Sequence, residues 1–98
     1  MSLPLRYLPE AKAELHQAIA WFANKRKGLG KQFASAVKQA LKPLRKMPKM
    51  HGIVIKDVRR ALVKGFSYAV LYRVTDDEVI IISIFQTSQD PSKWQSRI

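Results

Sequence analysis

Two stretches in the N-terminal half place apolar residues at spacings of three and four, the pattern of helices that bury one face. The first stretch follows a short apolar run, residues 3–8, which we interpret as a strand, and Pro9 stands where a helix would start. A second stripe runs from Leu29 to Leu44, and because Pro43 inside it lacks a backbone donor, we expect this helix to kink or end near Ala40. The short connector at residues 24–30 predicts a helical hairpin with both apolar stripes against one sheet. The two stripes comprise Leu8, Ala11, Leu15, Ala18, Ile19 and Phe22, then Leu29, Phe33, Val37, Ala40, Leu41 and Leu44.

The C-terminal half contains three strand-like runs at hairpin spacing, residues 58–64, 68–74 and 79–85. Alternation in the middle run places Tyr68 and Tyr72 on one face and Ala69 and Arg73 on the other. The last run is almost wholly apolar, as expected for a central strand covered on both sides, and residues 3–8 are its natural second partner. We read residues 46–52 as a loop. The sequence therefore predicts one α+β domain over residues 1–98: an N-terminal strand, a helical hairpin and a three-stranded antiparallel meander, with the helices packed on one face of a small twisted sheet.

The charge is concentrated in the centre of the chain. The 98 residues, enough for one core, carry a net charge of +11, and residues 25–64 hold 13 Lys or Arg against one acid, Asp57. Such a field attracts nucleic acid, an acidic protein segment or an anionic membrane surface, and the plain alternative is a solvated helix face without a partner. The absence of cysteine excludes a disulfide framework and a thiolate zinc site. With no membrane-span pattern and no signal-peptide pattern, we expect a cytoplasmic protein.

The residue types of common catalytic sites do not cluster in this sequence. His16 falls on the first predicted helix and His51 in a loop, and we expect both to be solvated. The acids at residues 76–78 form a hairpin turn, where polar residues are usual, and the four glycines lack a phosphate-loop spacing. We therefore predict no metal site, no cofactor and no covalent nucleophile.

Cations beside aromatic residues are the remaining candidates for function. Guanidinium groups bind phosphates or carboxylates in a bidentate manner, and aromatic rings stack on bases. Core packing competes with this role for Tyr72 and Phe85, and Trp94 is more typical of a residue that docks the tail onto the sheet. Arg60 could instead pair with Asp57 or Asp90. We expect the cations to gather on one open face that binds an anionic partner; they are Arg59, Arg60, Lys64 and Arg73 on the strands, and Lys93 and Arg97 in the tail.

Four segments in a fixed order carry a resemblance to a known family: YLPEAKAELHQAIAWF, GLGKQF, VRRALVKGFSYAVLYRV and VIIISIFQTSQDPSKWQSR. The chain resembles, almost from end to end, the RelE/ParE superfamily of toxins from type II toxin–antitoxin modules, also called plasmid-stabilisation proteins. The resemblance implies a sheet that curls around a basic concave face with the helical hairpin behind it. It also implies an acidic antitoxin that wraps and neutralises the toxin, operator DNA contacted only through that antitoxin, and no membrane partner.

Two activities occur in this superfamily: RelE-like members cleave mRNA in the ribosomal A site, and ParE-like members poison DNA gyrase. Arg60 stands where RelE-like nucleases carry a basic residue, but Ala69 replaces an arginine and Gln89 replaces another. Gln86 stands where many relatives have histidine, and an amide cannot accept or donate a proton near neutral pH. At roughly 3 kcal/mol for each lost charge-stabilising contact, these changes argue against an efficient nuclease.

The first hypothesis is accordingly a ParE-like toxin that inhibits growth by binding, with DNA gyrase as its target. The alternatives are a ribosome-dependent mRNA endonuclease working through Arg59, Arg60, Lys64 and Arg73, and a degenerate toxin-fold protein that binds only its antitoxin or DNA. We expect the antitoxin's acidic C-terminal segment to cross the sheet and pair with Arg59, Arg60 or Arg73. The predicted antitoxin- or target-binding residues are Arg59, Arg60, Lys64, Tyr68, Arg73, Gln86, Lys93, Trp94 and Arg97.

Overall fold

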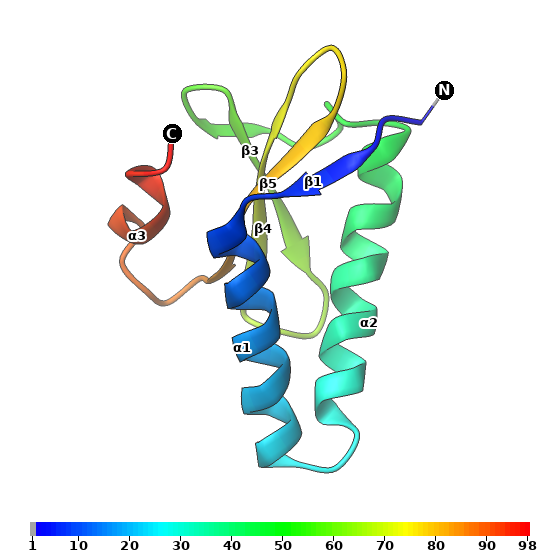
Figure 1. The fold of residues 1–98 in the computed structure, drawn as a ribbon, viewed down its shortest axis with the longest axis vertical. Helices are drawn as coiled ribbons and strands as arrows, with labels where there is room; N and C mark the ends of the chain where they lie inside the picture. Colours follow the sequence, from blue (N-terminus) through cyan, green and yellow to red (C-terminus); the bar gives the residue numbers. More distant parts are fainter. Residues whose placement is uncertain (1) are drawn as a thin grey trace.

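A helical hairpin covers one face of a five-stranded sheet in the computed structural model, which describes residues 2–98 (Figure 1). Met1 of the predicted domain lies outside the described residues. A short C-terminal helix lies on the other face of the sheet, so the sheet is covered on both sides near its centre. The elements in chain order are β1 (Leu5–Tyr7), α1 (Pro9–Lys25), α2 (Leu29–Leu41), the 3-10 helix η1 (Lys42–Arg45), β2 (Ile53–Ile55), β3 (Val58–Val63), β4 (Tyr68–Val74), β5 (Val79–Gln86) and α3 (Ser92–Gln95).

The strands lie in the order β1-β5-β4-β3-β2, with β1 parallel to β5 and the other neighbours antiparallel. This order confirms β5 as a central strand with the N-terminal strand as its second partner. The four-stranded expectation is incomplete, however, because Ile53–Ile55 forms the edge strand β2. Three residues with an irregular register and two exposed side chains give no alternating pattern, which is why the sequence did not reveal this strand.

Proline and glycine determine the ends of the hairpin's helices. Pro9 is in the first turn of α1, and α2 ends at Leu41, where a 3-10 turn containing Pro43 takes over. Gly28 precedes α2 with φ of 83°, a left-handed conformation that glycine adopts without strain. At Gly30 the helices approach so closely that an added Cβ would lie 2.7 Å from the carbonyl oxygen of Ile19. The predicted end of the second helix near Ala40 is confirmed within one residue.

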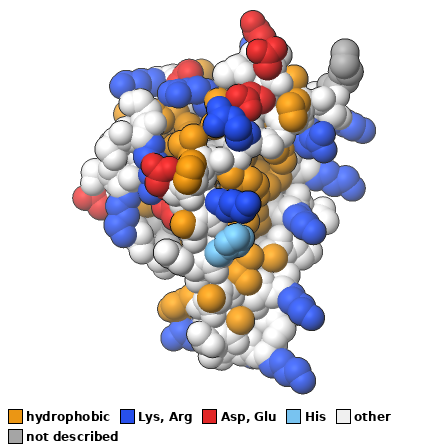
Figure 2. Space-filling view, viewed as in Figure 1, with side chains coloured by type: hydrophobic (Ala, Val, Ile, Leu, Met, Phe, Trp, Pro, Cys, Tyr) orange, Lys and Arg blue, Asp and Glu red, His pale blue; other side chains and the backbone are white. Residues whose placement is uncertain are grey.

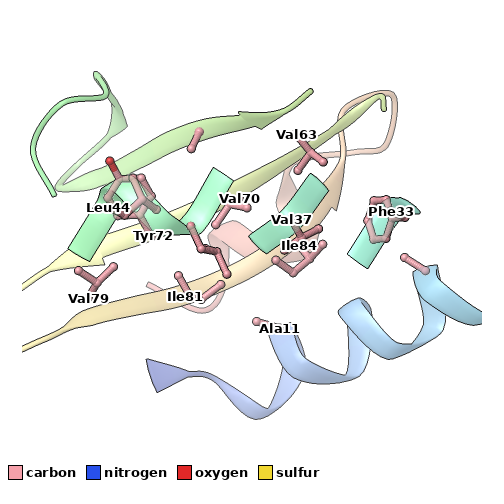
Figure 3. Packing of buried hydrophobic residues seen from close by; sticks show 13 residues of the cluster. Ala11, Phe33, Val37, Leu44, Val63, Val70, Tyr72, Val79, Ile81 and Ile84 are labelled. Carbon is pink, nitrogen blue, oxygen red and sulfur yellow. The ribbon is translucent and has the colours of Figure 1, made fainter. Parts of the chain in front are cut away.

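Two hydrophobic clusters hold these layers together. The larger cluster joins the hairpin to the sheet and contains Phe33 and Val37 from α2, with Val70 and Tyr72 from β4 (Figure 3). The smaller cluster lies on the opposite face and contains Ala69 and Leu71 together with Trp94 from α3. The alternation predicted for β4 is therefore confirmed, and both helices pack on one face of the sheet as expected. Tyr72 is a core residue whose hydroxyl donates a hydrogen bond to the carbonyl of Pro48 at 2.9 Å.

Candidate functional site

We expected the cations of the strands to gather on one open face. Within residues 2–98 they do not, because the arginines of β3 and β4 point in different directions. Arg59 lies opposite Tyr72, on the helix-covered face, and donates a 2.7 Å hydrogen bond to the carbonyl oxygen of His51. Arg60 is exposed on the other face, as the alternation of a strand requires of adjacent residues. Lys64 is exposed just beyond the end of β3. The expectation that these cations share one open surface is wrong.

Carboxylates or core packing engage three more of the predicted binding residues. Arg73 Nε lies 2.8 Å from Asp57 Oδ2, an ion pair in which this Nε makes no aligned hydrogen bond. Arg97 is paired with Glu14, and Trp94 is only 5% exposed, with its ring edge-on to Phe85. Trp94 therefore docks the tail onto the sheet instead of facing a ligand.

Neither pairing considered for Arg60 occurs within residues 2–98. Asp57 is taken by Arg73. Asp90 accepts the backbone N–H of Ser92 at 3.0 Å, and hydrogen bonding from Ser92 holds the pKa of Asp90 below its usual value. The expectation for His51 also needs correction: His16 is exposed, but the half-buried His51 lies edge-on to Tyr72.

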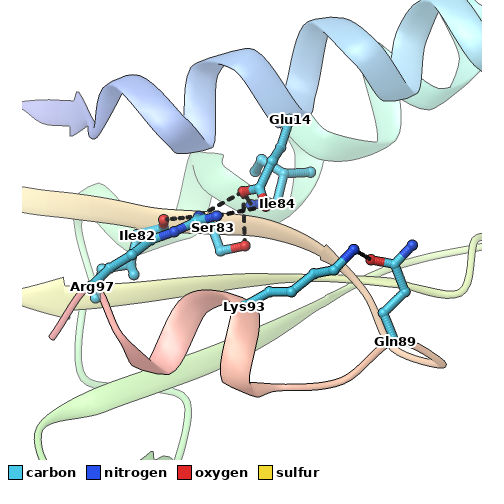
Figure 4. A network of polar contacts seen from close by, with 7 residues as sticks. All are labelled: Glu14, Ile82, Ser83, Ile84, Gln89, Lys93 and Arg97. Atoms are coloured by element: carbon cyan, nitrogen blue, oxygen red, sulfur yellow. Dashed lines mark hydrogen bonds and ion pairs between the residues drawn. The ribbon is translucent and has the colours of Figure 1, made fainter.

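Three predicted residues do come together, in a groove between α1 and the ends of β4 and β5. Tyr68, Gln86 and Lys93 all line this cavity of about 620 Å³, which we call the α1 groove. Lys93 Nζ donates to Gln89 Oε1 at 3.0 Å (Figure 4). Gln89 Nε2 in turn donates to Gln86 Oε1 at 3.2 Å. These two contacts orient the amides and the ammonium group along one wall. The exposed Trp21 and the half-buried Phe22 supply an aromatic wall from α1.

Glu14 of α1 also lines the α1 groove, and it organises a polar network behind it (Figure 4). Its Oε1 accepts hydrogen bonds from Ser83 Oγ at 2.8 Å and from the backbone N–H of Ile84 at 3.2 Å. Arg97 donates to both carboxylate oxygens, at 2.9 and 3.1 Å, and also to the carbonyl of Ile82 at 3.0 Å. One carboxylate thus joins α1, β5 and the C-terminal segment.

Proton transfer in the α1 groove lacks a suitable acceptor. The pKa of Tyr68 is raised above its ordinary value of 10.0, first by burial and then by the charge of Glu14, so the phenol stays protonated at neutral pH. Glu14 is the single acid among the residues lining the groove, and its oxygens already accept four hydrogen bonds. Gln86 and Gln89 cannot transfer protons. The arrangement is suited to binding polar or acidic groups.

The role of Glu14 was not predicted from the sequence, although a signal was present. Glu14 stands three residues after Ala11 and four before Ala18, on the stripe of α1 that faces the sheet. A carboxylate on the apolar face of a helix requires hydrogen-bonding partners, and its position predicts contacts with the element below. Trp21 and Phe22 gave no comparable signal, because an aromatic residue near the end of a helix is equally typical of a core. Within residues 2–98, no group of three His, Asp or Glu side chains is placed to hold a metal ion.

Comparison with known proteins identifies the family. A family model described as "ParE toxin of type II toxin-antitoxin system, parDE" matches residues 5–91. The chain belongs to the ParE toxin family. A comparison with curated protein sequences found no match.

Solved structures of this superfamily share the fold. The chromosomal ParDE system of P. aeruginosa contains a chain that superposes with a TM-score of 0.75 at 17% identity, covering 89% of this chain and 98% of that one. The YoeB dimer of Staphylococcus aureus gives a TM-score of 0.61 at 14% identity, covering 86% and 95% of the respective chains. These likenesses show an α+β toxin fold in which a helical hairpin packs on a mixed sheet. No helix within residues 2–98 combines the length and apolar character needed to cross a membrane.

Proposed function

We propose that this ParE-family toxin inhibits growth by binding DNA gyrase, without cleaving RNA or DNA, and that the α1 groove is part of its contact surface. One observation carries the proposal: the groove presents amides, an ammonium group and aromatic rings, but its one carboxylate is fully engaged. Such a set recognises polar and acidic groups of a protein, yet it cannot activate a hydroxyl for attack on phosphate. A toxin of this kind would act in the cytoplasm, where its target is found.

Trp21 supports a protein partner for this groove. It is 53% exposed although it is a large aromatic residue, and Lys25 Nζ lies 4.6 Å from the centroid of its ring. Exposed tryptophans beside a pocket are typical anchors of protein interfaces, where they become buried on binding. The target would then contact α1 and the loop after β5 together.

Supercoiling assays test this proposal directly. Purified protein is incubated with gyrase, ATP and relaxed plasmid, and both supercoiling and the accumulation of cleaved DNA complexes are measured. We expect the protein to inhibit supercoiling, Lys93→Gln to raise the inhibitory concentration about tenfold, and Lys56→Gln, which removes an exposed charge from the β2–β3 turn, to leave it unchanged. If the wild-type protein neither inhibits supercoiling nor accumulates cleavage complexes, gyrase is not the target.

Arg60 favours the second candidate, a ribosome-dependent mRNA endonuclease. It is exposed, it has no carboxylate partner within residues 2–98, and it occupies the basic position that the resemblance assigns to nucleases. Primer extension on mRNA bound to ribosomes distinguishes the two functions. Cuts in the A site that disappear with Arg60→Gln would establish the nuclease, because a gyrase inhibitor produces no such cuts.

We also propose an acidic antitoxin as the neutralising partner, at a surface different from the one expected from the sequence. Arg59 and Arg73 are engaged within the chain, so they are poor anchors for an incoming carboxylate. A second cavity of about 620 Å³, the α2 groove, lies between α2 and β3. Met50 is exposed there, and Lys64 is also among the lining residues. An amphipathic acidic segment could bury the Met50 side chain in this groove and pair with the lysine.

Substitution of Met50 tests the α2 groove. Met50 is 49% exposed, so Met50→Gln should leave the fold intact and weaken antitoxin binding about tenfold or more, because its apolar contact is lost. Met47→Gln is the matched control, since Met47 is 61% exposed and does not line the groove. Equal affinities of the wild type and Met50→Gln for the purified antitoxin, measured by calorimetry, would refute this placement.

A further inference from the structure

The solvent side of α2 carries lysines at helical spacing. Lys31, Lys38 and Lys42 are separated by seven and four residues, and all three are exposed. At 100° per residue, the three lysines point within about 40° of one another around the helix axis. Their mean direction is roughly 115° from that of the buried residues of α2. Lys42 is the residue immediately after α2, and its backbone remains helical with φ of −53° and ψ of −49°. We call these three side chains the lysine face.

No acidic residue competes for the lysine face from its own part of the chain. Residues 15–56 contain neither Asp nor Glu, and the ion pairs within residues 2–98 involve Arg6, Arg73 and Arg97. Figure 2 shows a column of Lys and Arg side chains along the right-hand edge of the molecule, where α2 runs in Figure 1. Lys27, before the helix, and Lys46, after it, are also exposed. None of the three lysines forms an ion pair within residues 2–98, so their charges have no direct carboxylate partner there.

We propose that the lysine face binds the phosphate backbone of duplex DNA, directly and without sequence preference. Lys31 and Lys42 are 11 residues apart, which is about 16 Å along the helix axis at 1.5 Å per residue. Duplex DNA carries about nine phosphates over that length, counting both strands, so each lysine can reach one. A lysine contacts phosphate as a point charge and reads no base. The three lysines would therefore position DNA without specifying its sequence.

The position of the lysine face favours DNA over the other polyanions that a basic protein attracts. Peripheral membrane helices insert apolar side chains beside their basic residues, but the large apolar residues of α2, Phe33, Val37 and Leu41, are buried in the core. An acidic peptide that folds on binding also needs apolar anchors, and the α2 groove lies about 100° further around the helix. The lysine face offers charge alone, arranged along a straight line, which matches a rigid polyanionic rod.

This inference is independent of the gyrase proposal, because it requires DNA contact by the toxin itself. It departs from the expectation that such a toxin meets DNA only through its antitoxin. It would also place DNA against α2 and away from the α1 groove, which no residue of α2 lines.

The test measures fluorescence anisotropy of a labelled 24-base-pair duplex of arbitrary sequence, titrated with the protein between 50 and 200 mM KCl. The variant that removes the lysine face, called the stripe variant, combines Lys31→Gln, Lys38→Gln and Lys42→Gln. At about 0.9 per phosphate contact, its slope of log affinity against log salt should be less steep by about 2.7, and its affinity at 0.1 M salt should fall on the order of 10²- to 10³-fold. The control variant combines Lys12→Gln, Lys49→Gln and Lys56→Gln, three exposed lysines elsewhere, and has the same net charge. It should bind within about fivefold of the wild type.

Each contrary result overturns the proposal. Equal losses in the two variants would mean that DNA responds to net charge alone, and no binding at 50 mM KCl would remove the site altogether. The same titration is repeated with vesicles of anionic phospholipid and with a polyglutamate peptide. If the vesicles bind as tightly as the duplex and lose affinity only in the stripe variant, the lysine face belongs to a membrane. The same result with the peptide would assign it to an acidic protein. Far-UV circular dichroism and thermal melting should be the same for both variants, since the substituted side chains are exposed.

Discussion

The strongest test of the fold concerns the pair formed by Glu14 and Arg97, which connects the C-terminal segment to α1. The change is Arg97→Met, which removes the guanidinium but keeps an unbranched apolar side chain. It deletes two charge-assisted hydrogen bonds to the carboxylate and one to the carbonyl of Ile82. Glu14 then keeps only Ser83 and the Ile84 N–H as donors. The remaining carboxylate is poorly hydrated, because its side chain is 23% exposed and that of Arg97 is 15% exposed.

The expected cost follows from this geometry. Breaking a fully buried ion pair costs about 3–5 kcal/mol, and partial exposure lets water solvate the partner left behind, so we expect a loss of about 2–3 kcal/mol in the free energy of unfolding. For a domain of this size that loss corresponds to a fall in Tm of roughly 10–20 °C. Glu14→Gln should cost a similar amount, and the double variant should cost clearly less than the sum, with a coupling of about 1.5 kcal/mol.

Urea unfolding followed by far-UV circular dichroism gives these free energies. Trp94 fluorescence in a Trp21→Phe background reports α3 separately, since Trp94 is buried and Trp21 is exposed. Arg6→Met is the matched control, because the Arg6–Glu78 pair is also bidentate but its arginine is 54% exposed, so its loss should be far smaller. A cost below about 0.5 kcal/mol for Arg97→Met, or strictly additive effects in the double variant, would refute the structural role of this pair.

Three further predictions concern packing and protonation. Gly30→Ala should destabilise the fold by about 2 kcal/mol in thermal melts, because the added Cβ would lie 2.7 Å from the carbonyl oxygen of Ile19; an unchanged Tm would contradict the close helix approach. Tyr72→Phe should cost about 1 kcal/mol, because the hydrogen bond to the carbonyl of Pro48 is lost, and a neutral effect in urea unfolding would count against that bond. Burial raises the pKa of every tyrosine above 10.0, so the folded state binds the phenolic protons more tightly; this stabilisation is complete below pH 10 and is lost as the pH rises through the folded pKa values. The three tyrosines are Tyr7, Tyr68 and Tyr72. Absorbance at 295 nm, followed as the pH is raised, should show none of them ionising at the ordinary pKa of tyrosine. A tyrosine that does ionise there would contradict its burial in the structure.

The secondary structure was largely predictable because its signals are local. The stripes of α1 and α2 and the apolar run of β5 extend over enough residues for their period to be evident, and the structure confirms all three. The edge strand β2 gave no such signal, since Ile53–Ile55 is too short to show a period and is stabilised by pairing with β3. Short strands form when a neighbour supplies hydrogen bonds, and that neighbour is not visible in the local sequence.

The candidate site was predictable only in part. Tyr68, Gln86 and Lys93 were expected at a binding surface, and they line one groove. The role of Glu14 depended on what lies beneath α1, which the sequence shows only as an unexplained carboxylate on an apolar face.

By itself, the sequence determined the type and order of the main elements, the position of the central strand and the excess of positive charge in residues 25–64. The tertiary structure alone decided which cations are free. Arg59, Arg73 and Arg97 are bound to a carbonyl or to carboxylates distant in the chain, while Arg60 and the lysines of α2 remain in solvent. The physical reason is that the period of a strand or helix is a local property of the chain, whereas the partner of a charged side chain is whatever group the fold brings within about 3 Å of it.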